Sequence, residues 1–232
     1  MKTLQDIHPD VLSELRQHIS LSPVSLKHPF PERPARALGL IKLDGEVFSS
    51  EKLLRIVCMR INLPFYLKIY STFIRPKLEY DLPVFSCEVV CMGSKKMFLV
   101  DAHTAGKGSG NEHADFFEGL LKIRGKYADL LKYQKVTGKG IQSVFSKAVC
   151  QVTIPGNMDE RALQIFREYL NAYVALVDKA RPLSGVALAA LRKEFESYLK
   201  TVVDHDPGVK GNIMFFGRQG GVERALDIFY GM

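Results

Sequence analysis

A single carboxylate, Glu88, interrupts the apolar run VFSCEVVC. Burial among apolar neighbours disfavours the charged form of a carboxyl group, so its pKa rises and it can donate a proton near neutral pH. Glu88 is therefore a candidate general acid. The alternative is an acid at a sheet edge or on a solvent-facing strand that pairs with one of the many lysines, and the pattern alone leaves both interpretations open.

The strands around Glu88 predict which residue lies beside it. Two β-rich runs, Leu67–Arg75 and Pro83–Cys91, flank a turn-forming segment. If the turn centres on residues 79–80, Ser71 lies opposite Glu88 on one face of the hairpin, with the Cβ atoms about 5 Å apart. The same face carries Ile69, Phe73, Val84, Ser86 and Val90. This face is the predicted location of the site.

Asp206, in the segment HDPGVKG, is the second candidate acid. An aspartate followed by Pro207 is a common helix start, in which the carboxylate caps the first turn. Gly208 and Gly211 weaken a helix, so the sequence predicts a loop or a frayed turn after this cap. Local pattern alone favours the capping role over a chemical one.

The other motifs in the sequence do not predict a cofactor or metal site. GKGSGN, Gly106–Asn111, has its third glycine one residue too early for a dinucleotide-binding loop and is interpreted as a flexible loop. The six histidines form no HxH or HExxH pair, so no metal site is predicted. Four cysteines, Cys58, Cys87, Cys91 and Cys150, lie in predicted strands and are interpreted as small buried hydrophobes, with metal ligation by the Cys87–Cys91 pair as the alternative.

Strands precede helices along the chain. The pattern predicts about six strands joined by short connections, which favours an antiparallel meander. The first two are predicted at Leu38–Leu43 and Glu46–Ser49, joined by a hairpin turn at Asp44-Gly45. The other four are Leu53–Ile61, the two runs around the turn and Lys96–Val100, and a seventh strand, Ser146–Ile154, is predicted after a helix.

Helical periodicity predicts a short helix at Asp10–Ile19, and further helices at Asn111–Tyr133, after an Asn157 cap, at Ser184–Val203 and near the end of the chain. Strands followed by helices indicate an α+β fold, with helices packed on an antiparallel sheet.

Composition is ordinary for a globular protein, with 47% hydrophobic and 25% charged residues among 232. No apolar run approaches the roughly 20 residues of a membrane span, and the polar first residues resemble no targeting signal, so a cytoplasmic protein is expected. A net charge of +7 favours an acidic partner, but the basic residues lack the interleaved aromatics of a nucleic-acid platform, so no nucleic acid is predicted. A single domain spanning residues 1–232 is predicted, with the helix and Pro-rich loop of residues 1–37 packing on it.

The stretch IYSTFIRPKLEYDLPVFSCEVV, the strand ending VDAHT and the tail DHDPGVKGNIMFFGRQGGVERALDIFYG together resemble the ferredoxin-dependent bilin reductases. The resemblance covers residues 38–231 and looks strongest to the compact, biliverdin-reducing branch that includes phycoerythrobilin synthase. It implies a single-domain α/β/α sandwich with a central antiparallel sheet, a linear tetrapyrrole bound between the sheet and the C-terminal helices, no tightly bound cofactor, and reduced ferredoxin as electron donor. An acidic ferredoxin on a basic surface and a monomer are further expectations of this resemblance.

The resemblance also assigns roles to residues. Glu88 falls where the family has a catalytic aspartate, Asp206 matches the family's second aspartate, and Ser71 falls where members have His or Asn. The expected substrate contacts are Ser71, Phe73, Val84, Ser86, Lys210 and Phe216. Because Glu replaces Asp and Ser replaces a titratable or amide side chain, two alternatives remain: a non-catalytic tetrapyrrole-binding protein, and a reductase of an opened chlorophyll catabolite. A reductase that uses NADH through GKGSGN is the most distant alternative.

Overall fold

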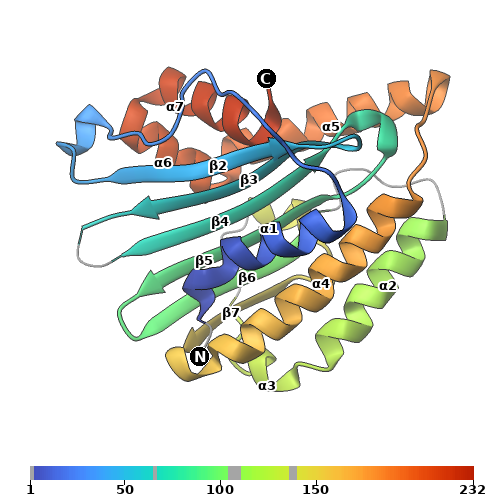
Figure 1. Ribbon diagram of the computed structural model, residues 1–232, viewed down its shortest axis with the longest axis horizontal. Coiled ribbons are helices and arrows are strands. Elements are labelled where there is room, and N and C mark those ends of the chain that lie inside the picture. The colour runs from blue at the N-terminus through green and yellow to red at the C-terminus, as the bar shows by residue number, and fades with distance from the viewer. Residues whose placement is uncertain (1–2, 65–66, 104–110, 136–139) are drawn as a thin grey trace.

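The computed structural model describes residues 3–64, 67–103, 111–135 and 140–232. Within them, a seven-stranded antiparallel sheet runs in chain order from β1 to β7 and lies between two layers of helices (Figure 1). The predicted α+β fold with an antiparallel sheet between helical layers is confirmed. None of the described helices is long and apolar enough to cross a membrane.

The strands are β1 (Ser22–Pro23), β2 (Lys42–Ser49), β3 (Leu53–Asn62), β4 (Lys68–Pro76), β5 (Val84–Met92), β6 (Lys95–His103) and β7 (Cys150–Pro155). The helices are α1 (Ile7–His18), α2 (Asn111–Gly125), α3 (Ala128–Leu131), α4 (Asp159–Lys179), α5 (Gly185–His205), α6 (Pro207–Phe216) and α7 (Arg218–Ala225), which continues as a π-helical turn at Leu226–Tyr230.

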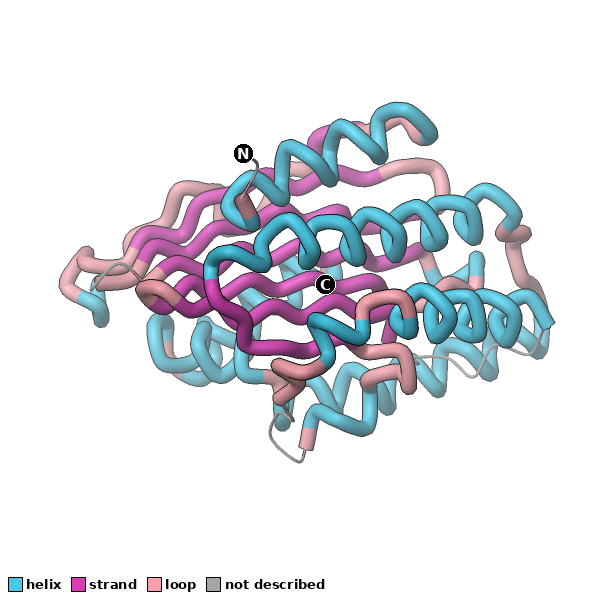
Figure 2. The backbone as a smooth tube through the Cα atoms, turned by 90° about the horizontal axis from the view of Figure 1, so that it is seen from below, coloured by secondary structure: helices cyan, strands magenta, loops and turns pink. Residues whose placement is uncertain are grey.

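Side chains alternate strictly between the two faces of the sheet, because successive residues of a strand point in opposite directions. On β5, Phe85, Cys87 and Val89 belong to the core under α1, α2 and α4. Ser86 and Glu88 point to the opposite face, which α5, α6 and α7 cover (Figure 2). All four cysteines are buried and free on the first face, which confirms their interpretation as small buried hydrophobes.

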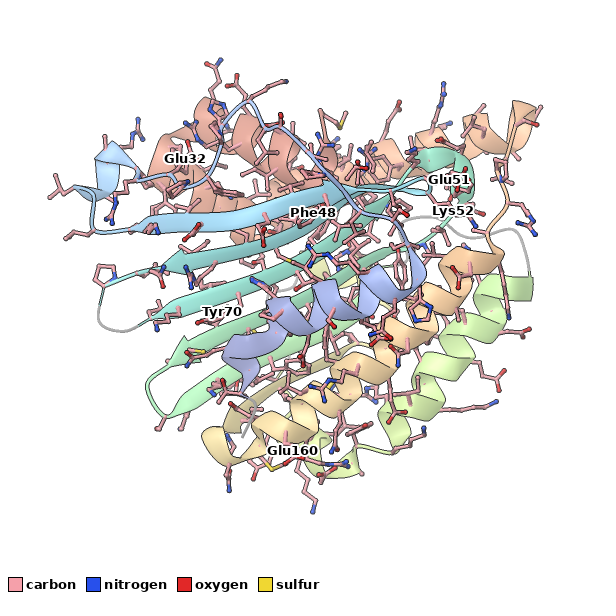
Figure 3. All side chains as sticks on the ribbon, in the orientation of Figure 1. Glu32, Phe48, Glu51, Lys52, Tyr70 and Glu160 are labelled. Atoms are coloured by element: carbon pink, nitrogen blue, oxygen red, sulfur yellow. The ribbon has the colours of Figure 1, made fainter. Side chains whose placement is uncertain are left out.

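The N-terminal segment contacts both helical layers. α1 packs on the sheet face that carries Tyr70 (Figure 3), whose ring centroid lies 5.8 Å from that of His8. The Pro-rich chain that follows crosses to the other layer. There Glu32 forms an ion pair with Arg224 of α7 at 3.1 Å. These contacts attach the first residues of the chain to the layer that covers the predicted site.

The hairpin predicted at Asp44-Gly45 is wrong, because β2 runs through these residues without a turn. Gly45 sits where β2 lies close against β3. A Cβ atom at this position would come within 2.6 Å of the Cys58 carbonyl oxygen. The glycine therefore permits a close backbone approach instead of a reversal of the chain.

Three predictions about helices also need correction. The helix predicted at Asn111–Tyr133 ends at Gly125, a poor helix former, and resumes as the short α3. Asn157 caps nothing; it lies in a 3-10 turn before α4, and the first residue of α4, Asp159, accepts hydrogen bonds from Leu4 N and Lys96 Nζ. The segment after Asp206 is a regular helix, α6, because its cap and its buried apolar residues outweigh its two glycines.

Candidate active site

A cavity of about 240 Å³ lies between the sheet and the C-terminal helices. Its walls are mostly apolar, with Met59, Ile69, Val90 and Leu99 from the strands and Val202 and Val209 from α5 and α6. An apolar cavity with a few convergent polar groups is the usual form of a small-molecule site. The polar side chains that face this cavity therefore decide what it can do.

Glu88 lies on the strand wall of the cavity. The predicted register is confirmed, because Ser71 pairs with Glu88 across β4 and β5, and the Ser71 hydroxyl donates a hydrogen bond of 2.7 Å to Glu88 Oε2. Burial raises the pKa of Glu88 to about 8, assisted by the negative charge of Asp206 and opposed by the Ser71 hydrogen bond. A carboxyl group with this pKa holds its proton at neutral pH and can give it to a bound ligand.

Asp206 lies on the helix wall of the same cavity. Its Oδ1 accepts hydrogen bonds from Gly208 N at 2.7 Å and Val209 N at 3.0 Å, so the predicted helix cap is confirmed. Burial raises the pKa of Asp206, while the two amide donors and the charge of Lys210 act in the opposite direction. Asp206 therefore caps α6 and faces the cavity at the same time.

The remaining predicted site residues divide into two groups. Phe73 and Ser86 line the cavity beside Glu88. Val84 lies on the same sheet face, but beyond the cavity, where it packs beneath α5. Lys210 is exposed on the outer side of α6, and Phe216 packs under the Arg224 guanidinium, with the carbon of that group 4.0 Å from the ring centroid. The helical period explains the position of Lys210, which follows Val209 directly and so points away from the cavity wall formed by Val209 and Asn212. Phe216 shares the helix face of these two residues, but it lies at the end of α6, about two turns beyond Val209, and does not line the cavity.

His103 is a cavity residue that the sequence did not single out. β6 extends three residues beyond the predicted Val100, which places His103 on the cavity face. Its Nε2 lies 2.9 Å from Ser86 Oγ and its Nδ1 lies 2.8 Å from Tyr198 Oη. Burial lowers the pKa of His103 to about 4, so the imidazole is neutral. The sequence signal for it is the alternation along β6, which places His103 on the same face as Leu99.

Asn212 supplies a second polar group that the sequence did not indicate. It is buried on the cavity wall, and its Nδ2 donates to Gly208 O at 3.1 Å. Among the described residues, its Oδ1 has no hydrogen-bond partner. A buried acceptor without a partner is costly, so a ligand N–H group at this position would relieve a penalty of about 1–3 kcal/mol.

Two other features bear on alternative chemistry. In the described ranges, no three His, Cys, Asp or Glu side chains gather closely enough to hold a metal ion. The GKGSGN loop predicted at Gly106–Asn111 lies outside the described residues, apart from the backbone of its last residue, which begins α2.

Comparisons with known proteins bear on the family and the fold of this chain. A sequence profile of the family described as ferredoxin-dependent bilin reductase matches residues 8–220. Phycoerythrobilin:ferredoxin oxidoreductase from Gloeobacter violaceus is 24% identical over 198 residues, which cover 83% of this chain and 80% of that protein. The enzyme of the same name from Nostoc punctiforme is 23% identical over 218 residues, covering 90% and 85% of the two chains.

Among solved structures, phytochromobilin synthase from tomato in complex with biliverdin superposes with a TM-score of 0.79. The superposition covers 96% of this chain and 80% of the tomato chain, at 17% sequence identity. At this identity the likeness establishes the fold.

Proposed function

The chain belongs to the ferredoxin-dependent bilin reductase family, and we propose that it reduces biliverdin IXα, or a dihydrobiliverdin, in the cavity between the sheet and the C-terminal helices. Ferredoxin dependence makes reduced ferredoxin the electron source. Ferredoxin carries one electron at a time, so a two-electron reduction passes through a radical form of the pigment. Each electron pair also requires two protons, which the protein must supply.

The convergence of Glu88 and Asp206 on one apolar cavity carries this proposal. The two carboxyls come from opposite walls, one from β5 and one from the junction of α5 and α6. A flat, apolar pigment with a polar edge would fill the space between them. In this arrangement Glu88 donates a proton, because its pKa of about 8 keeps it protonated at neutral pH.

Ser71 acts in this proposal as a positioning residue. Its hydroxyl donates to Glu88 Oε2 and thereby fixes the orientation of the carboxyl. The unpartnered Oδ1 of Asn212 is available to accept a pyrrole N–H group. Lys210 stays outside the cavity and influences the site through its charge on Asp206.

The net charge of +7 supports a docking surface for an acidic ferredoxin. Complementary charge accelerates encounter between such partners and is weakened by salt. We expect the rate of pigment reduction at limiting ferredoxin to fall as ionic strength rises, with no change in pigment affinity.

An anaerobic assay with biliverdin tests the proposal. The protein should form a coloured complex, and a reduced ferredoxin system should change its absorbance, with the product identified by chromatography. Glu88→Gln should bind the pigment but reduce it 10²–10⁴-fold more slowly, the usual contribution of a general acid. Glu118→Gln, which removes an exposed carboxyl on α2, is the matched control and should react at the parent rate.

Three results would redirect the assignment. Turnover at the parent rate by Glu88→Gln would remove Glu88 from the mechanism. Tight binding of biliverdin without reduction would support a non-catalytic binding protein. Failure with biliverdin but reduction of an opened chlorophyll catabolite would assign a different substrate to the same cavity.

A further inference from the structure

A chain of hydrogen bonds starts and ends in the cavity. Ser86 Oγ lies 2.9 Å from His103 Nε2, and His103 Nδ1 lies 2.8 Å from Tyr198 Oη. The Tyr198 hydroxyl in turn lies 3.4 Å from the Tyr230 hydroxyl. Ser86, His103 and Tyr230 line the cavity, whereas Tyr198 is buried beneath them on α5. Both ends of this chain of four groups therefore face the ligand space, and the Tyr198 hydroxyl that links them lies behind the cavity wall.

The direction of these hydrogen bonds is reversible. A neutral imidazole has one donor nitrogen and one acceptor nitrogen, and a hydroxyl group can both donate and accept. When His103 carries its proton on Nε2, it donates to Ser86 and frees the Ser86 hydroxyl to donate into the cavity. In the other tautomer, Ser86 donates to His103 and offers only lone pairs to a ligand. Exchange of the tautomer thus changes what the cavity wall presents.

The surroundings keep this imidazole neutral. The rings of Phe73 and Phe145 pack against it with centroid distances of 6.5 and 5.6 Å. Asp101, two residues earlier on β6, directs its carboxyl to the backbone and hydroxyl of Ser146. Burial without a charged partner lowers the pKa of His103 to about 4.

A buried cation lies at the Tyr230 end of the chain. The Arg75 guanidinium donates to the Tyr230 carbonyl oxygen and lies over the Phe195 ring, with its central carbon 4.6 Å from the centroid. Its positive charge opposes the rise in the pKa of Tyr230 that burial produces. This charge favours donation from the Tyr230 hydroxyl.

The chain is also separate from Glu88. Ser86 and Glu88 are two residues apart on one face of β5, which places their backbones about 7 Å from each other. A linear pigment lying along this strand would therefore meet a carboxyl and a serine hydroxyl at different atoms. Reduction of one double bond takes two protons, and the structure offers them two points of entry.

We propose that Ser86, His103, Tyr198 and Tyr230 form a proton relay that delivers a proton to the ligand atom next to Ser86. This proposal rests on the proposed function. In one transfer, the Ser86 hydroxyl gives its proton to a nitrogen or oxygen of the reduced pigment. Ser86 Oγ then takes the proton from His103 Nε2, Nδ1 takes one from Tyr198, and Tyr198 takes one from Tyr230. Tyr230 takes one from a hydronium ion at its end of the cavity, and that ion becomes water. Each group gains one proton and loses one, and the electrons come from reduced ferredoxin.

Tyr198→Phe tests the relay because it removes one link and leaves the ring packing in place. The matched control is Tyr173→Phe, which removes a buried hydroxyl on the opposite face of the sheet, where Tyr173 donates to Pro83 O at 3.0 Å. We expect Tyr198→Phe to bind biliverdin as tightly as the parent but to complete a single turnover at least about tenfold more slowly. Tyr173→Phe should keep the parent rate.

A proton inventory separates a relay from a structural effect. When several protons move together, the single-turnover rate depends on the fraction of D2O along a curve, and when one proton moves the dependence is a straight line. For the parent and Tyr173→Phe, the plot of rate against the D2O fraction should be curved, and for Tyr198→Phe it should be a straight line. His103→Gln is the second variant, since an amide can hold both hydrogen bonds but cannot exchange tautomers. It should bind pigment and react as slowly as Tyr198→Phe.

The outcomes distinguish this proposal from the one on which it rests. If Tyr198→Phe or His103→Gln reacts at the rate and with the curvature of Tyr173→Phe, the relay is wrong and the proposed function stands. If the unaltered protein neither binds nor reduces biliverdin, the proposed function fails and the relay falls with it.

Discussion

Replacing Glu88 by Gln should make the ligand-free protein more stable at alkaline pH. The folded state raises the pKa of Glu88 from 4.5 to about 8, so its contribution to the free energy of unfolding is fully present below pH 4.5 and is lost as pH rises through about 8. Glutamine keeps the size of the side chain and an oxygen that accepts from Ser71, but it never becomes charged. The parent should therefore lose stability relative to the variant as pH increases.

The magnitude follows from the size of the pKa change. At about 1.4 kcal/mol per unit, a rise from 4.5 to about 8 sets an upper limit of roughly 5 kcal/mol. Glu88 is partly exposed to the cavity, where water screens its charge, so we expect a difference of roughly 2–3 kcal/mol. Urea unfolding of parent and variant between about pH 5 and about pH 9 measures this difference.

The comparison isolates Glu88 from other buried acids. Burial also raises the pKa of Asp101, to about 7, but Asp101 is present in both proteins and its contribution cancels. Glu118→Gln serves as the control, because the ion pair with Lys122 lowers the pKa of this exposed carboxyl and predicts no growing advantage at high pH. A constant difference between parent and Glu88→Gln across the pH range would refute a raised pKa for Glu88 and, with it, the argument for a neutral proton donor.

Three further substitutions test other parts of the structure. Asp206→Asn should change the free energy of unfolding by less than about 0.5 kcal/mol, because asparagine also caps a helix, and should still slow pigment reduction. Asp206→Ala should slow reduction and also lower the free energy of unfolding by about 1 kcal/mol. If Asp206→Asn reduces the pigment at the parent rate, the only role of Asp206 is to cap α6. Gly45→Ala should lower the free energy of unfolding, measured in urea, by more than about 2 kcal/mol, because its Cβ atom would lie 2.6 Å from the Cys58 carbonyl oxygen. An unchanged urea midpoint would contradict the close approach of β2 and β3. Lys96→Met should lower the free energy of unfolding by about 3–5 kcal/mol, because it leaves the Asp159 carboxylate buried without its cation. The double variant that also carries Asp159→Leu should recover most of this loss.

The sequence was sufficient to place Glu88 opposite Ser71, and the reason is geometric. A short turn fixes the register of two antiparallel strands, and strict alternation then assigns every side chain to a face. β4 and β5 alternate strictly, and the segment that joins them, residues 77–83, is centred close to the predicted turn although it contains a 3-10 helix, so the pairing could be predicted without knowledge of the other helices. The Asp206 cap was predictable for a similar reason, since it depends only on the next three residues.

Features that depend on contacts between distant segments were not predictable. Gly45 is typical of a turn in its local sequence, and only the approach of β3 shows why glycine is needed there. His103 has no partner nearby in sequence; the hydroxyls that bind it come from β5 and from α5, 95 residues later. The inward direction of Asn212 depends on how α6 rotates against the sheet. Local pattern thus located one wall of the cavity, and the packing of the C-terminal helices determined the other.

The two acids of the cavity are not interchangeable, because their environments separate their proton affinities. Glu88 has one hydrogen-bond donor, Ser71, against the effect of burial. Asp206 has two backbone amides and the nearby charge of Lys210, all of which favour its charged form. Burial raises the pKa of both acids, and the charge of Asp206 adds to the rise at Glu88, whose pKa of about 8 keeps that carboxyl protonated near neutral pH. In the proposed reaction, donation by Glu88 leaves a negative charge in an apolar space that Asp206 also faces, and both features favour the return of a proton to the site before a second donation. We therefore expect the site to supply protons one at a time, which matches a donor that delivers electrons one at a time.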